Sequence, residues 1–310
     1  MRAFVLPEFG ATPEVRDLTI PEPGEGEVRV RVRAASVNGF DLAVANGYLQ
    51  GAMEHRFPVV LGKDFAGEVD AVGAGVEDLA AGDRVFGVVT KPFLGDGSFA
   101  EYVTVPAAIG LARIPAGVSF QDAAALGLAG TAATDSVDAA NITTGTVVLV
   151  AGATGGVGTH AVQLAARAGA HVIATARTDD EQRLVSALGA AETVDYTTDI
   201  AKQVRAAHPD GVDVVLHFAG DPAALAATLT PGGVSVSTLA QSAEQAGVDE
   251  EAFTSIQATP TPETLDRIAA DHADQRTQLT IEHQYGLEDA AAALGHFTRG
   301  TLGKLVITVS

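Results

Sequence analysis

The chain has 310 residues, of which 47% are hydrophobic and 19% charged, a composition typical of a globular protein with two domains. Its 39 acidic and 19 basic side chains give a net charge of −20, and such a surface repels nucleic acids and anionic lipids. The absence of cysteine excludes disulfides, a thiolate nucleophile and any cysteine-liganded zinc site. No apolar run reaches the roughly 18 residues that span a bilayer, and the N-terminus resembles no secretory signal. We therefore expect a cytoplasmic protein with no membrane or nucleic-acid partner.

The first 118 residues consist of short apolar runs separated by turn residues. The stretch GEVRVRVRAASV (26–37) alternates apolar and charged residues, as a half-buried strand does. Further short runs follow at 58–76 and 81–89, broken by Gly and Asp. This pattern predicts a small, mostly antiparallel β domain that closes in a barrel-like way.

A different rhythm begins at Ser119, a predicted N-cap with Asp122 three residues later, which starts an alanine-rich helix. Apolar strands then alternate with helices, so a parallel sheet covered on both faces is expected. The predicted strands are 146–151, 171–176, 192–196, 212–220 and 232–240, and the predicted helices are 156–168, 180–188 and 200–207. Residues 240–252 are expected to form a surface loop or helix. The tail returns to strand–helix–strand, so we assign 1–118 with 276–310 to one domain and 119–275 to the other.

The turn AGATGGVG (151–158) joins a predicted strand to a predicted helix, which is the context of a dinucleotide-binding turn. Gly155 would let the backbone approach a pyrophosphate, and Gly158 would let the helix pack close to the strand. The helix N-terminus would offer N–H groups to the anion. The predicted binding residues are Thr154, Gly155, Gly156 and Val157. A glycine-rich connection without a ligand is the alternative.

The end of the second strand indicates which nucleotide binds. An NAD site usually has Asp or Glu there, but this chain has Thr175, followed by Arg177. Because these side chains would bind a 2′-phosphate that a carboxylate would repel, the sequence predicts NADP(H). Asp179, Asp180 and Glu181 instead suit the first turn of the next helix. The alternative for Arg177 is an ordinary surface arginine.

Several stretches of the chain resemble the zinc-independent, NADPH:quinone oxidoreductase-like branch of the medium-chain dehydrogenase/reductase superfamily. They are AASVNGFDLAVANG (34–47), FPVVLGKDFAGEVDAVGAGVEDLAAGDRVFG (57–87), AGATGGVGTHAVQLAARAGAHVIATA (151–176), LGAAETVDY (188–196) and GLEDAAAALGHFTRGTLGKLVI (286–307). The resemblance covers nearly the whole chain. It implies an α/β protein: a GroES-like β-barrel catalytic domain plus a Rossmann domain with a doubly wound parallel sheet, and an active site between them. It also implies a homodimer or homotetramer, for which GGVSVST (232–238) is the expected edge strand.

The sequence predicts no metal site. Where zinc-dependent relatives have Gly-His-Glu, this chain has Gly62, Lys63 and Asp64, and residues 90–102 are too few for a structural zinc lobe. The eight histidines show no ligand spacing. Without a Lewis acid to ionise an alcohol, the expected reaction is hydride transfer from NADPH to a small-molecule quinone or α,β-unsaturated carbonyl (enone).

The resemblance also implies roles for single residues. It places Asn38 and Asp41 near the nicotinamide, Asn38 as an orienting contact and Asp41 as a residue that orders the loop. Tyr48 falls within one residue of a tyrosine that enoyl-thioester reductases use near the substrate carbonyl; the alternative is a packed loop aromatic. The remaining cofactor contacts that the resemblance implies are Thr131, Tyr196, Phe218, Ala219, Leu239 and Lys304.

Some assignments stay open. Thr131 alternatively bonds back to its own helix, Lys304 and Arg299 alternatively lie at the surface, and His217 is either a core histidine or a neighbour of the nicotinamide. Two alternative functions also remain open: an enoyl-thioester reductase, and a non-catalytic NADPH-binding protein with a structural or regulatory role.

Overall fold

The computed structural model describes residues 1–310, which form two compact units. One unit, here called the β unit, comprises residues 1–131 and 260–310, and the other, the sheet unit, comprises residues 132–259. These boundaries differ from the sequence assignment at 118/119 and 275/276. The sequence assignment puts the boundaries where strands give way to helices. The boundaries of the compact units depend instead on which residues pack together. The first part of helix α2 (Phe120–Ala139) and all of helix α8 (Pro262–Ala273) pack on strands of the β unit.

The first part of helix α2, which belongs to the β unit, packs closely there because its packing residues are small. Ala123, Ala124 and Ala125 are buried in one cluster with Phe86. A Cβ on Gly127 would lie 2.6 Å from Asp64 Oδ1, so glycine is required there. The predicted cap is confirmed, since Ser119 Oγ accepts a hydrogen bond from the Asp122 N–H at 3.0 Å.

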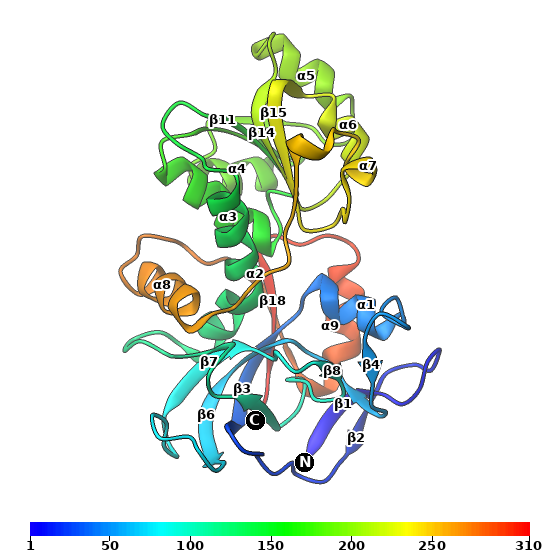
Figure 1. Ribbon diagram of the computed structural model, residues 1–310, viewed down its shortest axis with the longest axis vertical. Helices are drawn as coiled ribbons and strands as arrows, with labels where there is room; N and C mark the ends of the chain where they lie inside the picture. Colours follow the sequence, from blue (N-terminus) through cyan, green and yellow to red (C-terminus); the bar gives the residue numbers. More distant parts are fainter. The chain divides into compact units, whose positions relative to one another are not determined.

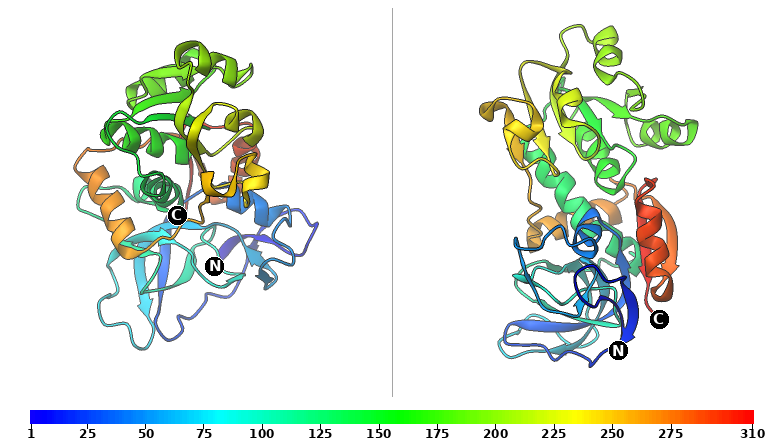
Figure 2. Two further views of the ribbon diagram at one scale, coloured as in Figure 1. Left: turned by 45° about the horizontal axis from the view of Figure 1, so that its top comes forward. Right: turned by 90° about the vertical axis from the view of Figure 1, so that its right-hand side faces the viewer.

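The β unit is built on a seven-stranded sheet with the order β10-β7-β6-β3-β18-β17 and β9 beside β3. In β3, Val28, Val30 and Val32 are buried and alternate with arginines, as the sequence predicts. All pairings are antiparallel except β17 with β18. The C-terminal strand β18 pairs with β3, so the two ends of the chain lie in one unit (Figure 2). The predicted β-barrel domain and the return of the tail are confirmed.

The strands of the seven-stranded sheet are β3 (Glu27–Ser36), β6 (Asp64–Val72), β7 (Arg84–Val88), β9 (Tyr102–Pro106), β10 (Leu111–Arg113), β17 (Ile281–Gly286) and β18 (Lys304–Thr308). The smaller sheets hold β1 (Arg2–Leu6), β2 (Glu14–Asp17), β5 (Val59–Val60), β4 (Glu54–His55) and β8 (Phe93–Leu94). The other helices of this unit are α1 (Gly39–Ala45), η2 (Leu287–Asp289) and α9 (Ala290–Phe297). No helix in the chain combines the length and hydrophobicity that a bilayer crossing requires.

The sheet unit contains a six-stranded, wholly parallel sheet with the order β13-β12-β11-β14-β15-β16. Its strands are β11 (Val147–Ala151), β12 (His171–Thr175), β13 (Glu192–Val194), β14 (Val212–His217), β15 (Leu229–Ser237) and β16 (Phe253–Ser255). Its helices are α3 (Gly156–Arg167), α4 (Asp179–Ala187), α5 (Ile200–Ala207), α6 (Pro222–Ala226), α7 (Ala243–Ala246) and η1 (Glu250–Ala252). The strand order reverses between β11 and β14, which marks the predicted doubly wound fold.

The strands are apolar throughout because successive side chains serve opposite faces. Val148 and Val150 pack beneath α3 and α4, whereas Leu149 and Ala151 pack beneath α5 and α6. Figure 1 shows these helices on either side of β11, β14 and β15.

The predicted edge strand is wrong. Residues 232–237 belong to β15, which pairs with β14 on one side and, over its last three residues, with β16 on the other. Strand β16 has three residues, too few to produce a recognisable pattern, and it occupies the edge instead.

Candidate active site

The glycine turn follows β11 at the point where the strand order reverses. Gly152 has φ +81°. A Cβ on Gly158 would lie 2.1 Å from the Gly152 carbonyl oxygen, so α3 packs as closely on the turn as the sequence predicts. A Cβ on Gly155 would meet only that carbonyl, at an ordinary 3.6 Å. The protein itself therefore requires glycine at 158 but leaves space at 155.

The N-terminus of α3 lacks a side-chain cap. Its N-cap is Gly155, which has no side chain to accept the first N–H groups. In contrast, Thr178 accepts from Glu181 N at the start of α4, and Asp199 accepts from Lys202 N at the start of α5. The N–H groups of the first turn of α3 are thus available to an external anion. Thr154, Gly155, Gly156 and Val157 are all partly exposed there.

Thr175 supports the turn from the neighbouring strand. Its buried hydroxyl accepts hydrogen bonds from Gly152 N at 2.9 Å and Ala153 N at 3.4 Å, and donates to Val150 O at 3.3 Å. Because both the proton and the lone pairs of this hydroxyl are engaged, Thr175 shapes the turn rather than offering a free group to a phosphate. The sequence predicts Thr175 as a ligand of the 2′-phosphate at the end of the second strand, which differs from this supporting role.

Arg177 is exposed and lies near Glu181 and Tyr196, to which the sequence gives different roles. Its N–H donates to Glu181 Oε2 at 2.5 Å, and its guanidinium makes no hydrogen bond within the protein. Tyr196, 47% exposed, donates its hydroxyl to Glu181 Oε1 at 3.1 Å. Burial, with the nearby Glu181 charge, raises the pKa of Tyr196. Arg177 and Tyr196 thus flank one carboxylate, which lies in the first turn of α4 as the sequence predicts and also completes its capping box.

The loops after β14 and β15 are held by a buried histidine. His217 Nδ1 lies 2.9 Å from Ser237 Oγ, and its Nε2 lies 3.2 Å from the Gly220 carbonyl oxygen. Ser237 Oγ accepts from Leu239 N and Ala240 N, so its proton points to Nδ1 and His217 is the neutral Nε2–H tautomer. Burial lowers the pKa of His217, in agreement with that form. His217 is therefore a satisfied core histidine.

The loop residues assigned to the cofactor lie at the same edge of the sheet as the turn. Phe218 is partly buried, while Ala219 and Leu239 are exposed. A Cβ on Gly152 would lie 2.9 Å from the Ala219 Cβ, so the turn and the loop after β14 are in close contact. Thr154 to Val157, Thr175, Arg177, Tyr196, Phe218, Ala219 and Leu239 all sit at or beyond the carboxyl ends of parallel strands, where ligands bind in such sheets.

The β unit holds a cluster of buried charges around Asp64. Its carboxylate accepts from Ser36 Oγ at 2.6 Å, Asn38 Nδ2 at 2.9 Å and Leu128 N at 2.7 Å. The Lys304 ammonium lies 3.5 Å away. Strand β3, helix α2 and strand β18 thus meet at one carboxylate.

Lys304 belongs to this cluster and not to the surface. Its Nζ donates to Asn38 Oδ1 at 2.6 Å and Val37 O at 2.9 Å, and burial lowers its pKa although Asp64 and Asp41 act to raise it. Asn38 Nδ2 also donates to Ser36 O at 3.2 Å. The amide of Asn38 is therefore fixed in orientation, with one oxygen lone pair left for another donor.

Asp41 is fully buried in the first turn of α1 and accepts from the Asn38 N–H at 2.8 Å. Burial, with repulsion from Asp64, raises the pKa of Asp41 to about 7, although the Asn38 hydrogen bond and the two lysine cations act to lower it. Lys63 donates to Val89 O at 2.5 Å and lies 4.7 Å from the centre of the Phe40 ring. Burial lowers the pKa of Lys63 as well.

Two further assigned residues, Thr131 and Tyr48, and Arg299, whose role the sequence leaves open, make no hydrogen bond with this cluster. Thr131 is buried and donates back to Gly127 O at 2.9 Å, which is the helix-bonding alternative. Tyr48 is 77% exposed after α1, and its hydroxyl has no partner in the protein. Arg299 is exposed beyond α9.

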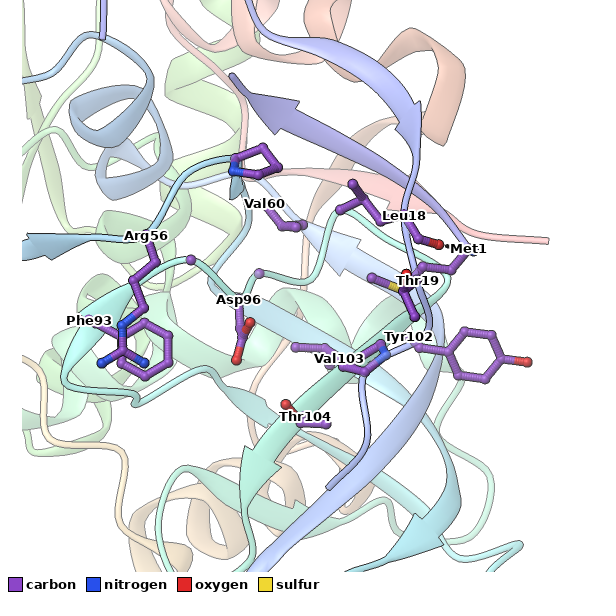
Figure 3. A pocket seen from close by; sticks show the side chains of 14 residues that line it. Met1, Leu18, Thr19, Arg56, Val60, Phe93, Asp96, Tyr102, Val103 and Thr104 are labelled. Carbon is purple, nitrogen blue, oxygen red and sulfur yellow. Dashed lines mark hydrogen bonds between the residues drawn. The ribbon is translucent and has the colours of Figure 1, made fainter. Parts of the chain in front are cut away.

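A hollow in the β unit lies elsewhere. It measures about 420 Å³ and none of the assigned residues lines it. Figure 3 shows Arg56 stacked on Phe93 at its rim and Asp96 and Thr104 within it. Asp96 and Thr104 both accept from Lys91 Nζ, so these two polar groups are already paired.

One group of residues was missed by the sequence analysis. His171, Glu192 and His208 in the sheet unit bring three potential metal ligands within 4.8 Å of one another. The sequence shows no ligand spacing among the histidines, and these three residues come together only in the folded chain. These residues are 21 and 16 positions apart and belong to different elements, so no local motif could reveal them.

Two family models match the chain. The model described as alcohol dehydrogenase GroES-like domain covers residues 24–116, and the model described as zinc-binding dehydrogenase covers residues 156–250.

Three curated relatives illustrate the sequence similarity. A mycocerosic acid synthase-like polyketide synthase of Mycolicibacterium smegmatis is 38% identical over 204 residues, which is 65% of this chain but 9% of that protein. The quinone oxidoreductase of Lama guanicoe is 35% identical over 70% of this chain and 66% of its own length. The chloroplastic NADPH-dependent alkenal/one oxidoreductase of Arabidopsis thaliana is 33% identical over 71% of this chain and 58% of its own length. The chain thus spans less than two thirds of each of these relatives.

Solved structures match over the whole chain. The quinone oxidoreductase from Coxiella burnetii has a TM-score of 0.91 at 28% identity and covers 100% of this chain and 99% of its own. An NAD-dependent alcohol dehydrogenase has a TM-score of 0.85 at 32% identity, with 100% of both chains covered. The mycobacterial protein Rv1454c, solved with NADPH, has a TM-score of 0.86 at 28% identity and covers 99% of this chain and 100% of its own.

The raised pKa of Asp41 predicts a pH-dependent stability. Between pH 3.8 and about 7 the folded protein holds a proton that the unfolded chain releases, so the free energy of unfolding falls as pH rises through this window. Asp41→Asn keeps the shape of the protonated acid and cannot ionise. We expect the melting temperature of Asp41→Asn minus that of the parent protein to be larger at pH 8 than at pH 4.

Asp266→Asn, at an exposed position of α8, controls for the change of net charge. A difference between Asp41→Asn and the parent protein that stays constant with pH would contradict the assignment.

Proposed function

Because the chain belongs to the medium-chain dehydrogenase/reductase superfamily, as a quinone oxidoreductase-like member, we propose that it is an NADPH-dependent reductase of quinones or α,β-unsaturated carbonyls. The observation that carries this proposal is the uncapped glycine turn at the point where the strand order of the sheet reverses. The relatives support the substrate class, since their names include quinone and alkenal/one oxidoreductases.

The residues of the sheet unit fit a doubly charged pyrophosphate and a phosphorylated ribose. The N–H groups at the start of α3 would hold the pyrophosphate, and the open space beside Gly155 would admit it. Arg177, with Tyr196 beside it, would hold the 2′-phosphate, because its guanidinium has no partner in the protein. The NADPH named for two of the relatives supports the same choice.

Bound NADPH would supply a hydride to an electron-poor carbon of the acceptor. The loops that His217 and Ser237 hold would position the nicotinamide end, since Leu239 N and the Gly220 carbonyl are fixed by these side chains. Asn38 would keep its proposed orienting role through its remaining oxygen lone pair, because Lys304 and Asp64 fix the amide. A protein that positions its reactants in this way lowers the barrier without a metal.

The proposal assigns no metal to the reaction. The chain has no cysteine, and Lys63 and Asp64 stand where a ligand pair would be needed. Lys63 donates to a backbone carbonyl and Asp64 is occupied by four partners. Neither side chain is free to hold an ion.

Tyr48 bears on the alternative of an enoyl-thioester reductase. That reading needs a tyrosine near the substrate carbonyl, but the Tyr48 side chain is 77% exposed and makes no contact that fixes it. The third reading, a non-catalytic NADPH-binding protein, shares the turn and differs only in the absence of turnover.

Turnover with different acceptors tests the proposal. NADPH oxidation is followed at saturating cofactor with quinones, enones and enoyl thioesters, for the parent protein and for Tyr48→Phe. We expect activity on quinones or enones that Tyr48→Phe changes by less than about twofold, since an exposed side chain adds little. A large loss confined to enoyl thioesters would favour the thioester reductase, and tight NADPH binding without any turnover would favour the non-catalytic reading.

Two glycines of the turn separate ligand binding from folding. Gly155→Ala meets no close atom, so we expect its melting temperature to stay within about 2 °C of the parent value. Its methyl group would occupy the space of the pyrophosphate, so its NADPH dissociation constant should rise at least about tenfold. Gly158→Ala, which clashes with the Gly152 carbonyl, should instead lower the melting temperature. Calorimetric titration and thermal unfolding measure both effects, and unchanged NADPH affinity in Gly155→Ala would contradict the site.

Arg177 should decide the preference for NADPH. Arg177→Ala removes a charge-assisted contact to the 2′-phosphate, so NADPH affinity should fall about tenfold or more while NADH affinity changes little. Arg183→Ala is the matched control, because Arg183 is an exposed arginine of the adjoining helix that pairs with Asp180. Equal losses for NADPH and NADH in Arg177→Ala would refute the assignment.

A further inference from the structure

We propose that His171, Glu192 and His208 form a binding site for a divalent transition-metal ion, with zinc as the best match. Glu192 Oε1 lies 2.7 Å from His171 Nε2 and 3.0 Å from His208 Nε2, so both imidazoles are aimed at the same oxygen. The two rings are tilted, with centres 5.2 Å apart. Two imidazole nitrogens and one carboxylate oxygen are the donors that zinc prefers, whereas Mg²⁺ and Ca²⁺ prefer oxygen alone.

The backbone holds all three residues in place. His171 begins β12 and donates its N–H to Thr146 O at 2.8 Å. Glu192 begins β13, where it pairs with Ile173 of β12. His208 ends α5 and donates its N–H to Val204 O at 2.7 Å. Side chains two residues apart on a strand share a face, so His171 lies on the same face as Ile173, and Glu192, the partner of Ile173, lies there too. Ile173 packs with Val204 of α5, so α5 covers this face.

The distances suit tetrahedral coordination. Zinc bonds of about 2.0–2.2 Å place neighbouring ligand atoms roughly 3.3 Å apart. The three ligand atoms already lie within 4.8 Å of one another, so side-chain rotation alone can reach this geometry. The side chains of His171, Glu192 and His208 are 39%, 37% and 19% exposed, which leaves a path for the ion and a fourth position for water.

The position of the site indicates its role. His171 and Glu192 stand at the amino ends of their strands, whereas the residues assigned to the nucleotide stand at the carboxyl ends. Strand β13 is an outer strand of the sheet, paired only with β12. A bound ion would therefore join this edge strand and the end of α5 to the body of the sheet, and would stabilise the sheet unit without taking part in hydride transfer.

Zinc titration of the untagged, chelator-treated protein tests the site. We expect one zinc ion to bind with micromolar or tighter affinity in calorimetry and to raise the melting temperature by a few degrees, with Mg²⁺ giving neither effect. His208→Ala should weaken zinc binding at least about 100-fold, since even loss of a residue that only supports a ligand costs 10–100-fold. Glu192→Gln keeps the packing and should also weaken binding. NADPH affinity should be the same with and without zinc.

His296→Ala is the matched control, because His296 is a half-buried histidine with Glu282 Oε1 3.6 Å from its Nε2. Zinc binding that survives His208→Ala but is lost in His296→Ala would overturn the proposal, as would no binding by the parent protein up to about 1 mM zinc. If His208→Ala and Glu192→Gln fail to fold, anomalous diffraction at the zinc edge from crystals of the parent protein decides the matter. A peak bonded to His171 Nε2 supports the site, and none there refutes it.

Discussion

The β unit depends on the buried carboxylate of Asp64. A fully buried charge is costly unless it is paired and hydrogen-bonded, and Asp64 has a hydroxyl, an amide, a backbone N–H and an ammonium around it. These groups come from β3, the start of α1, α2 and β18, and they lie up to 240 residues from Asp64 in the chain. Removing any one partner would leave a buried group unsatisfied, so the cluster requires that all four elements dock together.

The same cluster explains why Asn38 is placed so firmly. Its amide lies between Asp64 and the Lys304 ammonium, and its N–H is held by Asp41, so neither its position nor its orientation can change without breaking a buried contact. Side chains that orient a reactant must be held in this manner, because a small displacement costs a large fraction of the rate. The proposed orienting role of Asn38 is thus consistent with the way Asp64 and Lys304 fix its amide.

Much of the fold could be predicted because its patterns are local. The apolar run at 147–151 serves two faces of a sheet, and Ser119 with Asp122 marks the start of α2. The domain boundaries could not be predicted, because they depend on the small residues around Gly127 packing against Phe86 and Asp64, and no local pattern reports a distant partner. Strand β16 could not be predicted either, because three residues are too few to show the alternation of a strand.

For the site, the sequence could predict which loops gather but not where each side chain points. Parallel strands place their carboxyl ends at one edge, so the turn, Arg177 and the loops after β14 and β15 follow from topology. Thr131, Thr175 and Lys304 are predicted cofactor contacts, yet their polar atoms bond within the protein. Packing decides which of these partners a polar atom takes, and a local pattern does not report it. His171, Glu192 and His208 meet only because the starts of β12 and β13 lie beside the end of α5.

The internal bonds of Thr175 bear directly on how the turn would work. Thr175 fixes the N–H groups of Gly152 and Ala153, Gly158 packs against the turn, and His217 with Ser237 fixes the adjoining loops. The turn therefore has its shape before any ligand arrives, and a ligand need not order it, which raises affinity for a given set of contacts. The groups left without partners are the first N–H groups of α3 and the guanidinium of Arg177. An anionic ligand with phosphates spaced to meet both satisfies groups that the protein itself leaves open.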